Sequence, residues 1–213
     1  AIGPNVPAPD VSGDKEAWIG DDDLEKTLLA AGITMNSKNA SVIEFDFTPI
    51  SSKFSFDFLF ASEEYGNSQC EFSDAFAFLL TNTATGETTN LAVVPNSTTP
   101  ISVVTIRNML YNSSCPSVNA EYFGTFNGGS NAEESATNYN GQTVLLNASA
   151  TLEINQTYHI KLVIADRGDT NFDSAIFIAS DSFNIGQDVL GEDITLKRVK
   201  APGETTSIVL NSE

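Results

Sequence analysis

Basic residues are scarce in this chain of 213 residues. Ten Lys and Arg stand against 28 Asp and Glu, which gives a formal net charge of -18 at pH 7 and a pI near 4.1. Nucleic acids and anionic membrane surfaces are both bound through clustered positive charge. The composition therefore argues against nucleic acid as a partner. The surplus of carboxylates is accounted for either by bound cations or by a solvated acidic surface.

Long apolar runs and the side chains of common catalytic sites are also lacking. No stretch of about 18 apolar residues occurs, so we expect no membrane insertion. The only histidine, His159, lies in an alternating apolar segment and is expected to be a sheet residue. Without a second histidine or a GxSxG motif, serine hydrolysis and zinc hydrolysis are disfavoured. A glycoside hydrolase that pairs Glu64 with Asp74 or Asp166 remains a remote alternative, and we expect no enzyme.

Cysteine is limited to Cys70 and Cys115, which both lie in polar surroundings. An even number of cysteines outside apolar segments is typical of a disulfide formed in an oxidising compartment. Two thiols without a nearby histidine form a poor metal site. We therefore predict a Cys70–Cys115 disulfide.

What the sequence does contain is a succession of strand patterns after one helix. Acidic residues open the segment 21–32 and Gly32 closes it, which predicts a short helix. In 53–60 every second residue is Phe, so one face of a strand is aromatic. The other predicted strands are 41–47, 75–80, 91–95, 101–106, 143–150, 158–165 and 175–180. The expected fold is all-β, an antiparallel, jelly-roll-like β-sandwich with one short helix near the N-terminus.

One acidic loop follows the predicted strand 158–165. Asp166, Asp169, Asn171 and Asp173 place oxygen donors at short intervals. Calcium takes six to eight oxygen ligands in irregular geometry, so such a loop can wrap around it. The alternative is a turn held by Asx hydrogen bonds, and the sequence leaves the two open.

A second acidic group follows the aromatic strand. Glu63 and Glu64 are adjacent, so they point to opposite faces if the strand continues through them, and Asp74 lies ten residues beyond Glu64. Glu64 shares the face of the phenylalanines and would then enter the core or cap its end, where a carboxylate needs a cation, an Arg or strong hydrogen bonds. If the strand ends by Ser62, both glutamates are solvated. Asp22 is a further candidate calcium ligand, although capping of the helix is the favoured role of the acids at 21–23.

Aromatic residues are spread along the long polar interval 107–142. Loops of this length often carry binding function. The rings of this interval and its border are candidates for stacking against a glycan or peptide ligand, or for anchoring the loop to the sandwich. They are Tyr111, Tyr122, Phe123, Phe126 and Tyr139.

Five blocks of this sequence resemble a known family. They are FLFASEEY (58–65), FSDAFAFLLT (72–81), NLAVVPNSTTPISV (90–103), YNGQTVLLNASA (139–150) and QTYHIKLVIADRGDTNFDSAIFI (156–178). In this order they are similar to the choice-of-anchor L domains of bacterial surface and secreted proteins. The resemblance implies an extracellular, adhesin-like β module rather than a reaction. Its acidic blocks fall on the candidate ligands already named and on Ser174.

The domain expected from these patterns covers 1–186, and 187–213 is either a closing hairpin or the start of another module. Domains of the family usually begin with a strand upstream of AIGPN, so the resemblance implies an open sheet edge that another polypeptide could complete. The function we expect is a calcium-binding extracellular adhesion module with a glycan or peptide ligand. The alternative is a structural spacer or assembly module that pairs with a neighbouring chain.

Overall fold

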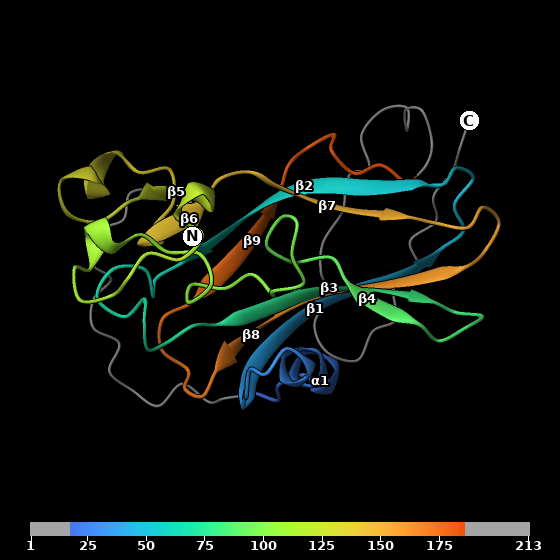
Figure 1. The fold of residues 1–213 in the computed structure, drawn as a ribbon, viewed down its shortest axis with the longest axis horizontal. Coiled ribbons are helices and arrows are strands. Elements are labelled where there is room, and N and C mark those ends of the chain that lie inside the picture. Colours follow the sequence, from blue (N-terminus) through green and yellow to red (C-terminus); the bar gives the residue numbers. More distant parts are fainter. Residues whose placement is uncertain (1–17, 186–213) are drawn as a thin grey trace.

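The alternating phenylalanines of the sequence form the central strand of a two-layered β-sandwich. The computed structural model of the protein describes residues 18–185. It confirms the predicted antiparallel sandwich, with one helix outside the two sheets (Figure 1). The predictions for the segment before residue 18 and for the tail 187–213 lie outside the described residues.

The first sheet has the strand order β1-β8-β3-β4. In the second, β5 pairs with β6, and β2 pairs with β6, β7 and β9. Every pairing between these strands is antiparallel. The strands are β1 (Ser37–Phe47), β2 (Lys53–Ser62), β3 (Ala75–Asn82), β4 (Thr88–Asn90), β5 (Phe123–Phe126), β6 (Gly141–Thr143), β7 (Leu146–Thr151), β8 (Tyr158–Arg167) and β9 (Ser174–Ile178). Three short 3-10 helices lie between β4 and β6: Met109–Tyr111, Ala120–Tyr122 and Gly129–Glu134.

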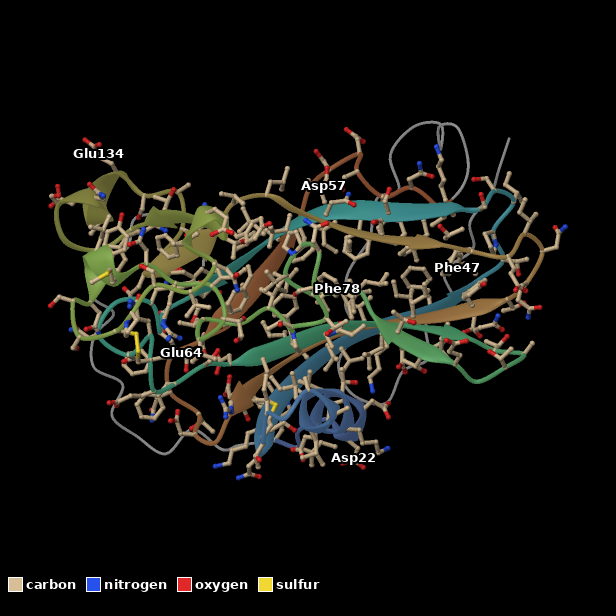
Figure 2. The ribbon with its side chains drawn as sticks, in the orientation of Figure 1. Asp22, Phe47, Asp57, Glu64, Phe78 and Glu134 are labelled. Atoms are coloured by element: carbon tan, nitrogen blue, oxygen red, sulfur yellow. A yellow bond between two sulfur atoms is a disulfide. The ribbon has the colours of Figure 1, made fainter. Side chains whose placement is uncertain are left out.

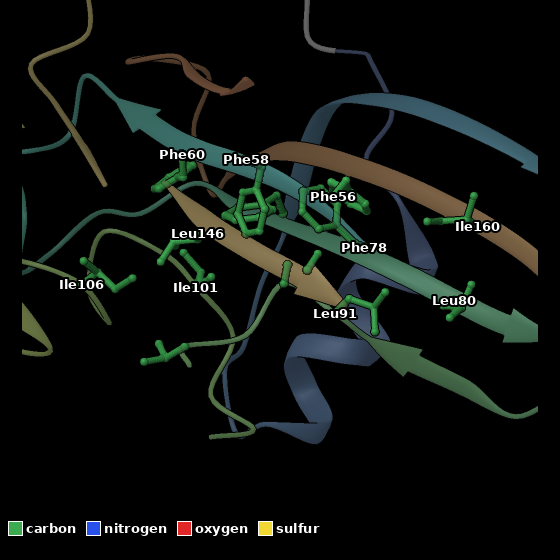
Figure 3. Packing of buried hydrophobic residues seen from close by; sticks show 14 of the residues in the cluster. Phe56, Phe58, Phe60, Phe78, Leu80, Leu91, Ile101, Ile106, Leu146 and Ile160 are labelled. Atoms are coloured by element: carbon green, nitrogen blue, oxygen red, sulfur yellow. The ribbon is translucent and has the colours of Figure 1, made fainter. Parts of the chain in front are cut away.

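The core lies between the sheets and is rich in aromatic residues. The four phenylalanines of β2 are at most 1% exposed. Three of them, Phe56, Phe58 and Phe60, pack against rings of β3, and Figure 3 shows Phe58 beside Phe78. Phe58 and Phe78 meet edge to face with their ring centroids 4.8 Å apart, a favourable aromatic geometry. Burying so many rings supplies the main driving force for folding.

The predicted helix is α1 (Asp22–Ala30), which covers the outer face of the first sheet. Asp21 caps it, because Oδ1 accepts hydrogen bonds from the amides of Asp23 and Leu24. Leu24 and Leu28 are buried against the small side chains of β3 and β8. Lys161 Nζ lies 2.6 Å from Asp21 Oδ2 and links β8 to the cap.

Two predicted strands, 91–95 and 101–106, are wrong. Both segments are apolar because they lie in the core, but they form turns, and their only ladder contact is an isolated bridge between Val93 and Pro100. Pro95 and Pro100 have no amide hydrogen to donate to a ladder. The predicted strand 143–150 is also divided, since β6 ends at Thr143 and β7 begins at Leu146.

Candidate functional site

The two acidic loops predicted from the sequence lie side by side. β2 and β9 are paired up to Ser62 and Ser174, so the loop after β2 meets the loop before β9. The amide of Glu63 donates to the carbonyl of Asp173 at 3.1 Å, and the amide of Asp173 donates to Glu63 Oε2 at 3.0 Å. The pairing of the strands therefore brings together acids that are about 110 positions apart in the sequence.

The sequence left open whether Glu64 is buried in a continuing strand or solvated after a strand that ends by Ser62, and the structure combines parts of both. The strand does end at Ser62, whose Oγ accepts a hydrogen bond from the amide of Glu64. The Glu64 side chain is nevertheless only 3% exposed and lies at the end of the sandwich where the acidic loops meet (Figure 2). Its Oε2 accepts a hydrogen bond of 2.6 Å from the amide of Asp74. Glu64 is therefore a buried carboxyl group and not a solvated one.

Asp74 is the second buried carboxyl group of the site. It is 2% exposed, and its Oδ1 receives only a long hydrogen bond of 3.4 Å from the amide of Arg167. Asp74 Oδ2 and Ser174 Oγ are both buried without a hydrogen bond of good geometry, although the Ser174 hydroxyl lies close enough to Asp74 to lower its pKa. A carboxylate oxygen without a partner is costly to bury, so this position favours a bound cation or a retained proton.

The electrostatics of this pair point in the same direction. Loss of solvent on burial raises the pKa of Glu64 to about 7 and that of Asp74 to about 8. The hydrogen bond from the Asp74 amide opposes this rise in the pKa of Glu64, the charges of Asp169 and Asp166 contribute to it, and the charge of Arg167 opposes it. The guanidinium group of Arg167 donates to the carbonyl of Thr34 at 3.0–3.1 Å. At neutral pH the pair therefore resists ionisation unless positive charge enters the site.

The loop after β8 contains the Asx hydrogen bond that was the alternative to a calcium loop. Asp169 Oδ1 accepts from the amide of Asn171 at 2.8 Å. Asp166 Oδ2 accepts from Asn39 Nδ2 of β1 at 2.9 Å. Asn171 and Asp173 are exposed, whereas Asp166 and Asp169 are partly buried. Calcium binding by these residues stays a prediction, and Asp166 and Asp169 are the two whose charges act on Glu64.

Asp22 lies apart from the two loops. It is exposed in the first turn of α1, far from Glu64 in Figure 2. Within residues 18–185, no group of three or more His, Cys, Asp or Glu side chains has the geometry of a metal site. A cation held by Glu64 and Asp74 would therefore take its other ligands from hydroxyl groups, carbonyl groups or water. This donor set suits calcium, which accepts neutral oxygens and irregular geometry.

The candidate ligand-stacking rings mostly contact other parts of the protein. Tyr111 stacks on Phe126 with centroids 4.4 Å apart and remains 36% exposed. Tyr122 and Phe126 are partly buried against the core. Tyr139 is 7% exposed and meets Phe177 of β9 edge to face. Phe123 is 8% exposed, so of the five candidate rings Tyr111 is the most available to a ligand, and the binding role itself stays a prediction.

The predicted disulfide is confirmed, and it attaches the interval 107–142 to the acidic site. Cys70 and Cys115 are bonded, with their Cα atoms 5.8 Å apart. The Asn112 side chain donates to the carbonyls of Gly66 and Asn67 at 3.1 Å, and the fully buried Gln69 donates to the carbonyl of Asn108. No sequence pattern identified these amide contacts, because a buried Gln or Asn looks like any other loop residue until its partner is known.

His159 has the structural role predicted for it. It lies on β8 opposite Asp46, and its Nδ1 is 2.7 Å from Asp46 Oδ1. Glu44 approaches the other ring nitrogen at 3.6 Å. The histidine therefore links two strands on the outer face of the first sheet.

Comparison with known protein families matches residues 1–184 to the Choice-of-anchor L domain. The family consists of non-enzymatic modules of bacterial surface-associated or secreted proteins. No curated protein and no solved structure matches the sequence. Among the described helices, none combines the length and the apolar character needed to cross a membrane.

Proposed function

The chain belongs to the choice-of-anchor L domain family, and from this membership and its buried acids we propose that it is an extracellular, calcium-binding adhesion module. Calcium would bind at the end of the sandwich and hold the two acidic loops together. A glycan or peptide ligand would bind beside them, on the surface of the interval 107–142.

The observation that carries the calcium proposal is the pair of buried carboxyl groups. Glu64 and Asp74 are nearly inaccessible to solvent, they are linked by the Asp74 amide, and one oxygen of Asp74 has no hydrogen-bond partner. Two buried carboxylates repel each other, and a divalent cation removes that cost while supplying the missing partner. Glu64 and Asp74 would be direct ligands, and Asp166 and Asp169 would add negative charge nearby.

The proposal for the ligand rests on the position of Tyr111. Its ring is partly exposed and is held by Phe126, which packs on the core. A preformed aromatic face costs little conformational entropy when a sugar ring or a planar peptide group stacks on it. The disulfide fixes this segment to the loop that contains Glu64, so an ion at the acidic site would stabilise the ligand surface as well.

The calcium proposal is tested by thermal unfolding of metal-stripped protein with and without millimolar calcium, with magnesium as the control. A ligand that binds only the folded state adds about 2.7 kcal/mol at 100 times its Kd. For a domain of this size, that should raise the Tm by about 5–10 °C. An unchanged Tm, with metal analysis proving that the starting protein is empty, would contradict the proposal.

The ligand proposal is tested with a glycan array and an extracellular-matrix peptide array, both probed with and without calcium. We expect binding that is lost on chelation and weakened by Tyr111→Ala. Tyr111→Phe serves as the matched control because it keeps the ring. Binding that is unchanged in Tyr111→Ala, or the absence of any ligand on either array, would count against this surface.

A further inference from the structure

β1 is an edge strand whose outer side is only partly occupied. One side pairs with β8 along the length of the strand. On the other side, the amides of Asn39 and Ala40 donate to the carbonyls of Trp18 and Ile19 at 3.0 and 3.1 Å. Within residues 18–185, no strand pairs with this side at residues 41–47. Their backbone groups thus offer a seven-residue edge for a further strand.

The side chains along this edge are unusually apolar for an open strand. Ile43 is 63% exposed, Val42 42% and Phe45 38%. Ile43 and Phe45 are on the side of β1 that faces between the sheets, whereas Val42, Glu44 and Asp46 are on the outer side. Natural edge strands are usually protected by charges or by a covering segment. An occupant that fits here has an apolar residue opposite Phe45 and positive charge near Glu44.

The described chain ends beside this edge. Asn184 exchanges two backbone hydrogen bonds with Ser55, at 2.9 and 2.7 Å. The ring of Phe183 lies 6.1 Å from that of Phe45, between centroids. The chain runs antiparallel to β2 here, towards the end of the sandwich where β1 ends and β2 begins. Residues 186–213 therefore continue from a point next to the open edge.

We propose that residues 194–200 add to the free edge of β1 as an antiparallel strand. The segment 186–193 can extend over about 27 Å, which is enough for the chain to reverse direction at the end of the sandwich. The segment reads Ile-Thr-Leu-Lys-Arg-Val-Lys and contains three of the ten basic residues of the chain. It therefore supplies apolar residues at the alternate positions Ile194 and Leu196, together with the positive charge that the edge lacks.

One antiparallel register places an apolar residue opposite Phe45 and a basic residue opposite Glu44. With Lys197 opposite Glu44, Leu196 lies opposite Phe45. In the same register, Val199 lies opposite Val42. Arg198 and Lys200 then lie on the inner face opposite Ile43 and Ser41, and the exposure of Ile43 allows the guanidinium group to reach water. A shift of one residue would turn the leucine to the outer face and the lysine towards the core, so the register is well specified.

The test is residue-resolved amide hydrogen exchange, measured by NMR on the full 213-residue chain at low concentration. Alternate amides of residues 41–47 point away from β8 and should exchange rapidly unless a strand covers them. We expect them to be protected, and we expect Leu196→Asp to reduce the protection at least tenfold. Leu210→Asp, which places the same charge elsewhere in the tail, is the matched control and should leave it unchanged.

A charge exchange tests the register without removing apolar surface. Glu44→Lys alone should lower the protection, and Glu44→Lys combined with Lys197→Glu should restore it. Rapid exchange at this edge in the unmodified chain would overturn the proposal. So would protection that appears only as sedimentation detects dimers, because a second copy would then occupy the edge. Protection that survives Leu196→Asp would assign the edge to another segment, such as residues 1–17.

Discussion

Replacing Asp74 by Asn should stabilise the protein when no calcium is present and abolish its response to calcium. Asp74→Asn keeps the shape of the side chain but removes one of two buried negative charges. The new amide group can donate a hydrogen bond to the surrounding carboxylates, which the unpartnered Oδ2 of Asp74 cannot do while it is ionised. If Asp74→Asn raises the stability of the calcium-free protein and abolishes its stabilisation by calcium, then Asp74 belongs to a cation site. Substitution of an ordinary structural carboxylate would not have both effects.

The size of the pH effect on stability follows from the number of protons that the folded and the unfolded protein bind. In the unfolded chain, both carboxyl groups lose their protons near pH 4, whereas burial raises the pKa of Glu64 to about 7 and that of Asp74 to about 8 in the folded protein. Below pH 4 both states are protonated and no penalty exists. Between pH 5 and 7 the folded protein holds up to two extra protons, so the free energy of unfolding falls as the pH rises. Each extra proton contributes about 1.4 kcal/mol per pH unit.

The assay is denaturant unfolding of metal-stripped protein at half-unit steps from pH 5 to pH 8. The free energy of unfolding of the unmodified chain should fall by up to about 2.7 kcal/mol per pH unit through the contribution of this pair. Asp74→Asn should lose about half of that slope. At pH 7.5 calcium should raise the stability of the unmodified chain only. Asp22→Asn is the control, because it removes the same charge from an exposed helical turn.

Three results would refute this reasoning. The first is a pH slope that is the same in Asp74→Asn and the unmodified chain. The second is calcium stabilisation that survives Asp74→Asn. The third is a loss of calcium stabilisation in Asp22→Asn, which would place the ion at the helix instead.

Three further predictions concern stability. Replacing both Cys70 and Cys115 by Ser should lower the free energy of unfolding by about 4 kcal/mol, since the closed loop joins residues 45 positions apart, and chemical denaturation measures this. Asp21→Ala should cost about 1–3 kcal/mol by the same assay, because it removes both the helix cap and the ion pair with Lys161. Phe58→Ala should cost about 3–5 kcal/mol, because it leaves a cavity between the sheets.

Each of these has a matched control. Reducing agent should destabilise the unmodified chain as much as the double serine variant and should leave that variant unchanged. Asp21→Asn keeps a capping oxygen, so it should cost less than Asp21→Ala. Phe72→Ala removes a ring that is 44% exposed and should cost much less than Phe58→Ala. Equal costs within either pair of substitutions would contradict the assigned contacts.

Local sequence patterns were sufficient to predict secondary structure where a segment had one clear periodicity of apolar residues. The alternating phenylalanines of β2 predicted a strand and its buried face, and the acids before Leu24 predicted the start of α1. The apolar segments around Pro95 and Pro100 were misassigned, because burial alone makes a turn look like a strand. Their prolines indicated that a ladder could not run through them.

The acidic site was only half predictable. Its residues could be named from their oxygen-donor chemistry, but the sequence could not tell whether Glu64 turned inward. That depends on Asp74, whose amide receives the Glu64 carboxylate from across a ten-residue loop. The family resemblance predicted an open sheet edge without naming its strand, and nothing within SVIEFDF indicates which of its two edges has a partner.

The disulfide also limits how far this domain can lengthen under tension. A pull on the two ends of a surface module would unravel its strands, and each released residue adds up to about 3.4 Å. The bond between Cys70 and Cys115 joins residues 45 positions apart. Even when the rest of the chain is fully extended, the end-to-end length therefore stays about 150 Å shorter while this bond is intact. The stretch from Cys70 to Cys115 includes all of β3, and the ends could separate fully only after chemical reduction. In a reducing environment the same module would become a considerably longer tether.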